Sequence, residues 1–226
     1  MHKQVVVGMG TGRCGTASLC ALLNQQPGTS ITHEQYPLLP WQLSPRILAK
    51  KLSQISRRRA DIVGDIANSW LPYVAAVLQQ VPSAKFICLE RDRAATVQSF
   101  IAKMKGRKNH WLEHDGRKWK RDHRRDPCFP KYDTLDMEEA IGLYWDDYYQ
   151  QVNFLCEKFP RNVRKWRTEQ ALDSEQGVEE ILSFIGVDKA DQKRTVGIVR
   201  NRQRTRLQSQ LRLRLAQLRN LLRPCQ

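Results

Sequence analysis

The first 104 residues alternate short apolar runs with segments of helical period, and this alternation constrains the fold more than any other feature. Parallel strands need a crossover between them, usually a helix, because a tight turn can join only antiparallel strands. The sequence therefore predicts an α/β fold with a central parallel sheet flanked by helices on both faces. The expected strands lie at residues 5–7, 30–32, 61–66 and 84–89, and the expected helices at 17–25, 45–56, 70–80 and 93–104.

The second half of the chain continues the pattern after one interruption. We expect a helix at residues 137–159, a fifth strand at 163–167 and a helix at 178–185. Residues 105–136 break the pattern and have the composition of a long surface insertion. Leucines at 207, 211, 215, 218 and 222 form one stripe of an amphipathic helix at about 203–223. The 226 residues are therefore interpreted as a single domain, residues 1–226, that carries this insertion and this C-terminal helix.

Positive charge is concentrated in two segments of a chain whose formal net charge is +15. Residues 103–131 hold eleven Lys/Arg against four acidic residues, and residues 192–226 hold ten with no acidic residue. Such asymmetry favours an anionic partner, although a solvated basic face is the alternative. No apolar run approaches the roughly 20 residues of a membrane-spanning helix, and the N-terminus has no secretory pattern. We expect a cytoplasmic protein without a transmembrane segment; the sequence does not indicate its oligomeric state.

A glycine-rich turn, Gly10-Thr11-Gly12-Arg13-Cys14-Gly15-Thr16, separates the first expected strand from the first expected helix. In such a turn the backbone approaches a ligand closely, and the first N–H groups of the helix point at an anion. The guanidinium of Arg13 can bind phosphate or sulfate oxygens in a forked geometry, and the hydroxyl groups of Thr16 and Ser18 can donate as well. The turn therefore predicts an anion site.

Two nucleotide-binding motifs match this turn in part. An ATP- or GTP-binding P-loop has the same glycine spacing, but Thr16 stands where that motif needs lysine. The dinucleotide motif GxGxxG is matched by Gly10, Gly12 and Gly15, and Glu34 follows the second strand where a ribose-binding acid is expected. The second match makes an NAD(P)-dependent oxidoreductase an alternative function.

Two motifs together resemble the sulfotransferases that use 3′-phosphoadenosine 5′-phosphosulfate (PAPS). Residues 12–19 resemble the 5′-phosphosulfate loop of that family, although Cys14 and Ala17 replace common hydroxyl residues. Residues 86–99 resemble its 3′-phosphate motif, in which a strand ends at Arg91 and Ser99 follows eight positions later on the next helix. A nicotinamide enzyme has no need of this pair. The resemblance implies a three-layer fold similar to the P-loop kinases, PAPS as co-substrate and no metal.

The resemblance also implies roles for individual residues. Glu34 is the expected catalytic base, with His33 as the nearest alternative, and Arg13 is expected to stabilise the leaving phosphate. A surface carboxylate is the alternative for Glu34. The cofactor-binding set comprises Gly12, Arg13, Cys14, Gly15, Thr16, Ala17 and Ser18 for the 5′-phosphosulfate, and Arg91 and Ser99 for the 3′-phosphate.

The acceptor is less well defined by the sequence. Asp65, Trp70, His110 and Trp111 are the expected acceptor-binding residues, with helix capping as the alternative for Asp65 and packing on the domain as the alternative for the tryptophans. The histidines of the insertion match no standard zinc spacing, so no metal is predicted. The predicted function is sulfation of a hydroxyl or amine on a carbohydrate, peptide or small molecule, of which an anionic one suits the basic charge. A non-catalytic nucleic-acid-binding protein is a further alternative, but it leaves the paired motifs unexplained, so nucleic acid is no obligatory partner.

Overall fold

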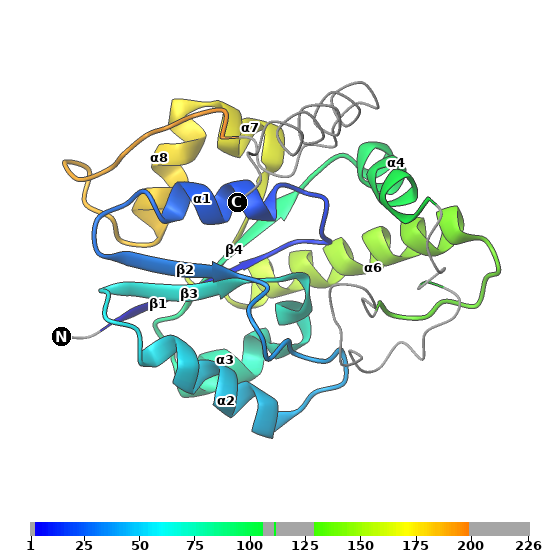
Figure 1. Ribbon diagram of the computed structural model, residues 1–226, viewed down its shortest axis with the longest axis horizontal. Helices are drawn as coiled ribbons and strands as arrows, with labels where there is room; N and C mark the ends of the chain where they lie inside the picture. The colour runs from blue at the N-terminus through cyan, green and yellow to red at the C-terminus, as the bar shows by residue number, and fades with distance from the viewer. Residues whose placement is uncertain (1–2, 106–110, 112–128, 199–226) are drawn as a thin grey trace, which may run out of the picture.

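The computed structural model describes residues 3–105, 111 and 129–198, and these form a three-layer α/β structure (Figure 1). Its sheet has five strands, all parallel, in the order β2-β3-β1-β4-β5. The predicted central parallel sheet is therefore confirmed, including its fifth strand. The strands are β1 (Gln4–Met9), β2 (Thr29–His33), β3 (Ile62–Ile66), β4 (Lys85–Glu90) and β5 (Val163–Arg167).

The helices follow the expected pattern with two differences. The expected helix at residues 70–80 begins as a 3₁₀ helix that contains Pro72, whose ring and missing N–H do not fit the interior of an α-helix. A short helix after β5, α7, was not predicted, because its six residues are too few to show a period. The helices are α1 (Thr16–Leu23), α2 (Pro45–Ser56), η1 (Asn68–Tyr73), α3 (Val74–Gln80), α4 (Arg93–Met104), α6 (Met137–Lys158), α7 (Thr168–Asp173) and α8 (Glu175–Phe184).

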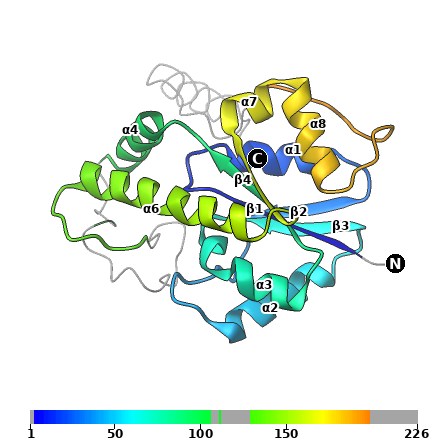
Figure 2. The same cartoon turned by 180° about the vertical axis from the view of Figure 1, so that it is seen from behind.

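Helices cover both faces of the sheet (Figures 1 and 2). Along β1 successive side chains point to opposite faces, as the pleat of a strand requires. Val6 packs with α1, α7 and α8 on one face, whereas Val7 packs with α2, α3 and α6 on the other. Both valines are fully buried. The near-continuous apolar strands of the sequence are thus explained by a sheet that has no solvent face.

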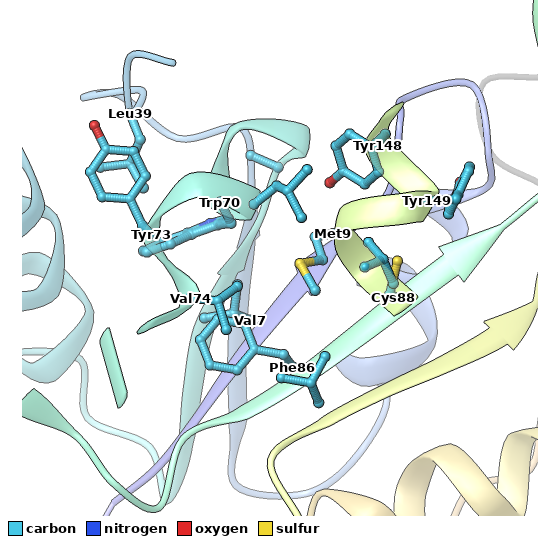
Figure 3. Close-up of a cluster of buried hydrophobic side chains, with 14 of the residues drawn as sticks. Val7, Met9, Leu39, Trp70, Tyr73, Val74, Phe86, Cys88, Tyr148 and Tyr149 are labelled. Atoms are coloured by element: carbon cyan, nitrogen blue, oxygen red, sulfur yellow. The ribbon is translucent and has the colours of Figure 1, made fainter. Parts of the chain in front are cut away.

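The core between the sheet and the helices α2, α3 and α6 contains a cluster of aromatic side chains. Figure 3 shows Trp70 and Tyr73 gathered with Tyr148 and Tyr149 above the sheet. Trp111 and Phe129, both of the basic insertion, stack with ring centroids 4.1 Å apart, and the centroid of Trp111 lies 5.2 Å from that of Tyr144 on α6. Part of the insertion is therefore packed on the domain. Residues 106–110 and 112–128 of the insertion, and the expected helix at 203–223, lie outside the described residues.

The strand order fixes where a ligand can bind. The chain builds β3 and β2 on one side of β1, and then β4 and β5 on the other side. Ligands of open α/β sheets bind at such a switch point, outside the carboxyl ends of the strands. The loop after β1 therefore lies between the loops after β3 and β4. Among the described helices, none is both long and apolar enough to cross a membrane.

Gly64 of β3 provides a test of this packing. A Cβ atom at Gly64 would lie 1.7 Å from the carbonyl oxygen of Val6 on the neighbouring strand. We expect Gly64→Ala to lower the free energy of unfolding by about 1–3 kcal/mol or more, because strands β1 and β3 must separate to admit the methyl group. Urea denaturation measures this loss.

Gly142 on α6 offers the matched control. The three atoms nearest to a Cβ there all belong to the guanidinium at the far end of the Arg93 side chain, and none belongs to the backbone. Gly142→Ala should therefore change the stability by no more than about 1 kcal/mol, since alanine also improves the helix propensity. Equal losses in the two variants would contradict the close approach of β1 and β3.

Candidate functional site

The loop between β1 and α1 has an unusual backbone. Gly12, Arg13 and Gly15 all have positive φ, at 86°, 60° and 91°. Such left-handed residues are typical of backbone nests, in which N–H groups converge on an anion. Gly15 is also the N-cap of α1, so the first two N–H groups of that helix, those of Thr16 and Ala17, open at this loop without a partner in the helix. A side chain at Gly15 would not fit, because its Cβ would lie 2.8 Å from Cγ2 of Thr168.

The two sequence motifs meet in space. The Nε of Arg13 donates a hydrogen bond to Oγ of Ser99 over 3.0 Å, and Nη1 of Arg91 donates to the carbonyl oxygen of Arg13 over 3.0 Å. Arg13 comes from the β1 loop, Arg91 from the end of β4 and Ser99 from α4. The pKa of Arg13 is lowered, first by burial and then by the positive charge of Arg91. An anion bound here would relieve both costs, since it neutralises two cations held close together.

The end of β2 approaches the same loop. Nε2 of His33 lies 3.1 Å from Oγ1 of Thr16, the first residue of α1. Glu34 is exposed and has a φ of 50°, and its N–H donates to the carbonyl oxygen of Ile66 over 2.8 Å. Its carboxylate opposes the lowering of the pKa of Arg13. His33 and Glu34 thus lie beside the anion loop, where the sequence placed them.

Asp65 lies at the carboxyl end of β3 and is completely buried. Its Oδ2 is 2.9 Å from Nζ of Lys51 and accepts a hydrogen bond from Nε1 of Trp70 over 3.2 Å. Burial lowers the pKa of Lys51, and the charge of Asp65 opposes this effect. Capping does not explain Asp65, because the N-cap of the following 3₁₀ helix is Ala67 and makes no side-chain cap hydrogen bond.

Of the other expected acceptor-binding residues, Trp70 and Trp111 are buried, and His110 lies outside the described residues. Trp70 is 0% exposed and Trp111 is 1% exposed. A role for Asp65, Trp70 or Trp111 in acceptor binding stays a prediction, and it requires that these buried side chains become accessible. His110 lies outside the described residues, as do His114, His123 and Cys128 of the insertion.

Cys14 and Ala17 are the positions at which the loop departs from the sulfotransferase motif. The side chain of Cys14 is fully buried, and burial raises the pKa of its thiol. The carbonyl oxygen of Cys14 accepts a hydrogen bond from Oγ1 of Thr168 over 2.8 Å. The Cys14 side chain therefore packs beneath the loop instead of facing a ligand. Anion binding at this position depends on the backbone.

Helix α6 contributes residues that the sequence analysis did not assign to the site. The hydroxyl of Tyr148 accepts from the N–H of Gly10 and donates to the carbonyl oxygen of Asn68, each over 3.0 Å. Other side chains of the helix hold further carbonyl groups of the three loops. Tyr144 donates to Thr11 over 3.1 Å, Tyr149 to Leu89 over 2.7 Å, and Trp145 to Arg91 over 3.1 Å.

These contacts join the ends of β1, β3 and β4 through one helix. The signal in the sequence is the aromatic spacing at 144, 145, 148 and 149, which places these side chains along one side of a helix. That spacing alone is equally typical of a helix that packs on a core. Only the strand order shows that this side faces the loops.

Two solved structures with a similar fold are sulfotransferases. A sulfotransferase from Alicyclobacillus acidocaldarius aligns with a TM-score of 0.54 and 17% identity, over 96% of this chain and 92% of that chain. The mouse sulfotransferase SULT7A1, complexed with PAP, aligns with a TM-score of 0.51 and 16% identity, over 83% of this chain and 60% of that chain. At these identities the likeness shows that the chain shares the fold of these enzymes. Neither the family models nor the curated proteins give a match.

The strand order argues against the dinucleotide alternative. In the dinucleotide-binding order 3-2-1-4-5-6, the second strand lies beside the first, so an acid at its end reaches the ligand on the glycine loop. Here β3 separates β2 from β1. The match of Gly10, Gly12, Gly15 and Glu34 to that motif is therefore not accompanied by the strand order of the dinucleotide-binding fold.

Tyr148 allows a test of the support that α6 gives to the loop. We expect Tyr148→Phe to lower the free energy of unfolding by about 1–3 kcal/mol, because it leaves the N–H of Gly10 buried without an acceptor. Tyr132→Phe is the matched control, since its hydroxyl bonds the half-buried Asp147. Chemical denaturation of both variants measures the difference. A loss for Tyr132→Phe as large as that for Tyr148→Phe would contradict the special role of the loop contact.

Proposed function

We propose that this protein is a sulfotransferase that moves a sulfuryl group from PAPS to a hydroxyl or amine acceptor. The observation that carries the proposal is the contact of Arg13 with Ser99 and Arg91. The two motifs are about 80 residues apart in sequence, and each resembles one half of a PAPS site. Their meeting at the carboxyl ends of β1 and β4 supports a single ligand with two anionic groups. The shared fold supports the same class of enzyme.

The residues present fit a PAPS molecule. We assign the 5′-phosphosulfate to the backbone N–H groups of residues 15–17 and to the guanidinium of Arg13, since the N–H of Ser18 donates to the carbonyl oxygen of Gly15 over 2.9 Å. Arg91 and Ser99 are assigned to the 3′-phosphate. Thr16 and Ser18 contribute hydroxyl groups, whereas Cys14 and Ala17 contribute only backbone. A ligand with two phosphate-like groups offsets the electrostatic cost of placing Arg91 beside Arg13.

The chemistry requires a base on one side of the sulfur and a cation on the other. The acceptor oxygen or nitrogen forms a bond to sulfur as the bond from sulfur to the 5′-phosphate oxygen breaks. Glu34, which is exposed beside the loop, takes the proton that the acceptor loses. Arg13 stabilises the negative charge that develops on the leaving phosphate. His33 is the second candidate for the base, but its Nε2 lies against Thr16, which favours Glu34.

The acceptor is assigned only by class. A carbohydrate, a peptide or a small molecule with a free hydroxyl or amine would suit the reaction. The basic residues at 103–131 and 192–226 favour an anionic acceptor of this kind. The same charge would suit a nucleic acid, but nucleic-acid binding does not account for the paired motifs.

Calorimetry with 3′-phosphoadenosine 5′-phosphate (PAP), AMP and NAD tests the donor site. We expect PAP to bind more tightly than AMP or NAD, and Arg91→Ala to weaken PAP binding about 10- to 100-fold, as befits the loss of a charge-assisted hydrogen bond. Arg93→Ala is the matched control, because its guanidinium is held by Asp146 in an exposed ion pair. Equal binding of AMP and PAP would remove the 3′-phosphate assignment.

Glu34→Gln tests the catalytic assignment separately. We expect this variant to bind PAP as the wild type does but to turn over PAPS about 10²- to 10⁴-fold more slowly, because it has lost the general base. The release of PAP from PAPS measures turnover. Unchanged turnover would exclude Glu34 as the base and transfer the assignment to His33.

A further inference from the structure

A buried ion pair lies directly behind the proposed base, and the chemistry described above does not use it. Lys51 of α2 and Asp65 of β3 are 2% and 0% exposed, with Nζ and Oδ2 2.9 Å apart. Charges are buried at a high cost, and an apolar pair of the same volume is often as stable. The cost of this pair suggests that it has a role other than stability, and its hydrogen bonds show which segment it holds.

The two residues of the pair bond the carbonyl oxygen and the N–H of Gln35. Nζ of Lys51 donates to the carbonyl oxygen of Gln35, and the N–H of Gln35 donates to Oδ1 of Asp65 over 3.3 Å. The guanidinium of Arg58 adds two bonds, to Oε1 of Gln35 over 2.5 Å and to Oγ1 of Thr32 over 2.9 Å. Gln35 is exposed, yet its peptide groups are tied to the interior.

Glu34 is thereby fixed on both of its sides. Its own N–H is bonded to the carbonyl oxygen of Ile66 over 2.8 Å, and the next residue is held by the ion pair. The φ of 50° at Glu34 is a left-handed conformation that costs energy for any residue except glycine. Such a conformation persists only where the surroundings impose it. Here the surroundings that impose it are β3 and the Lys51–Asp65 pair.

We propose that the Lys51–Asp65 pair positions Glu34 for catalysis by clamping the peptide groups of Gln35. Lys51 and Asp65 are positioning residues, because they act through the turn at 34–35 and do not touch the reacting atoms. The inference rests on the proposed function, in which Glu34 is the base.

Hydrogen exchange of the wild-type protein gives the first test. The amides of Glu34 and Gln35 should exchange as slowly as amides in β3, although both residues are exposed. Exchange as fast as that of an unbonded loop amide would overturn the proposal without the need for any variant.

Variants of Lys51 give the second test. Lys51→Met should speed the exchange of the Glu34 and Gln35 amides at least tenfold and leave the amides of β1 and α1 unchanged. The double variant Lys51→Met with Asp65→Asn removes the uncompensated buried charge and should show the same local effect if the single variant does not fold. Lys50→Met, an exposed neighbour on α2, is the control and should change neither set. Unchanged exchange at residues 34 and 35 would contradict the clamp.

A double-mutant cycle connects the clamp to turnover. Lys51→Met should slow the release of PAP from PAPS at least tenfold and leave the affinity for PAP unchanged. In the Glu34→Gln background the same change should cause no further loss, because Lys51 acts only through Glu34. Losses that multiply in the double variant would overturn the positioning role.

The two proposals fail in different ways. If the wild type does not bind PAP, or if Glu34→Gln keeps full turnover, the proposed function or its base is wrong. If PAP binds and Glu34→Gln is inactive, but Lys51→Met keeps full turnover, only the positioning proposal is wrong.

Discussion

The site depends on one requirement, that the peptide groups leaving the carboxyl ends of the buried strands find hydrogen-bond partners. A parallel sheet covered on both faces offers no water to these groups, so an unmade bond there costs its full desolvation. Helix α6 meets the requirement with phenol and indole groups. Tyr148 joins Gly10, after β1, to Asn68, after β3. The glycine loop is thus held by a segment more than 130 residues away, and its left-handed backbone does not rest on local sequence alone.

Charge is distributed unequally around the loop. On the side of β4, Arg91 and Arg13 lie close together and are only partly shielded, so an anion is favoured there. On the side of β2 and β3, Lys51 and Asp65 satisfy each other and offer no net charge to a ligand. Glu34 lies between these two regions. In the reaction we propose, the two arginines belong to the half of the site that binds the polyanionic donor, and the ion pair belongs to the half that orients the carboxylate of Glu34.

The departures of the loop from the usual sulfotransferase motif have a structural reason. The Sγ of Cys14 occupies the space beside Gly10, where an added Cβ would meet it at 2.5 Å. At this position the side chain fills the core beneath the loop, and its carbonyl oxygen is held by Thr168. A hydroxyl is therefore not needed there to form the cradle. The fold shared with solved sulfotransferases at 16–17% identity shows how far the side chains of this scaffold can vary.

The sequence by itself determined the elements and the motifs. Apolar runs and helical periods placed all five strands, and the resemblance of two motifs to those of a family predicted that the glycine turn, Arg91 and Ser99 lie close together, as their hydrogen bonds show. Tertiary structure alone decided the strand order, which separates β2 from β1, and the burial of Trp70 and Asp65, two residues that the sequence assigned to acceptor binding. It also decided the contacts of the α6 aromatics and of Lys51. The physical reason is that periodicity reports which side of an element is apolar, whereas hydrogen bonds between distant segments depend on which elements become neighbours, and no local pattern records that choice.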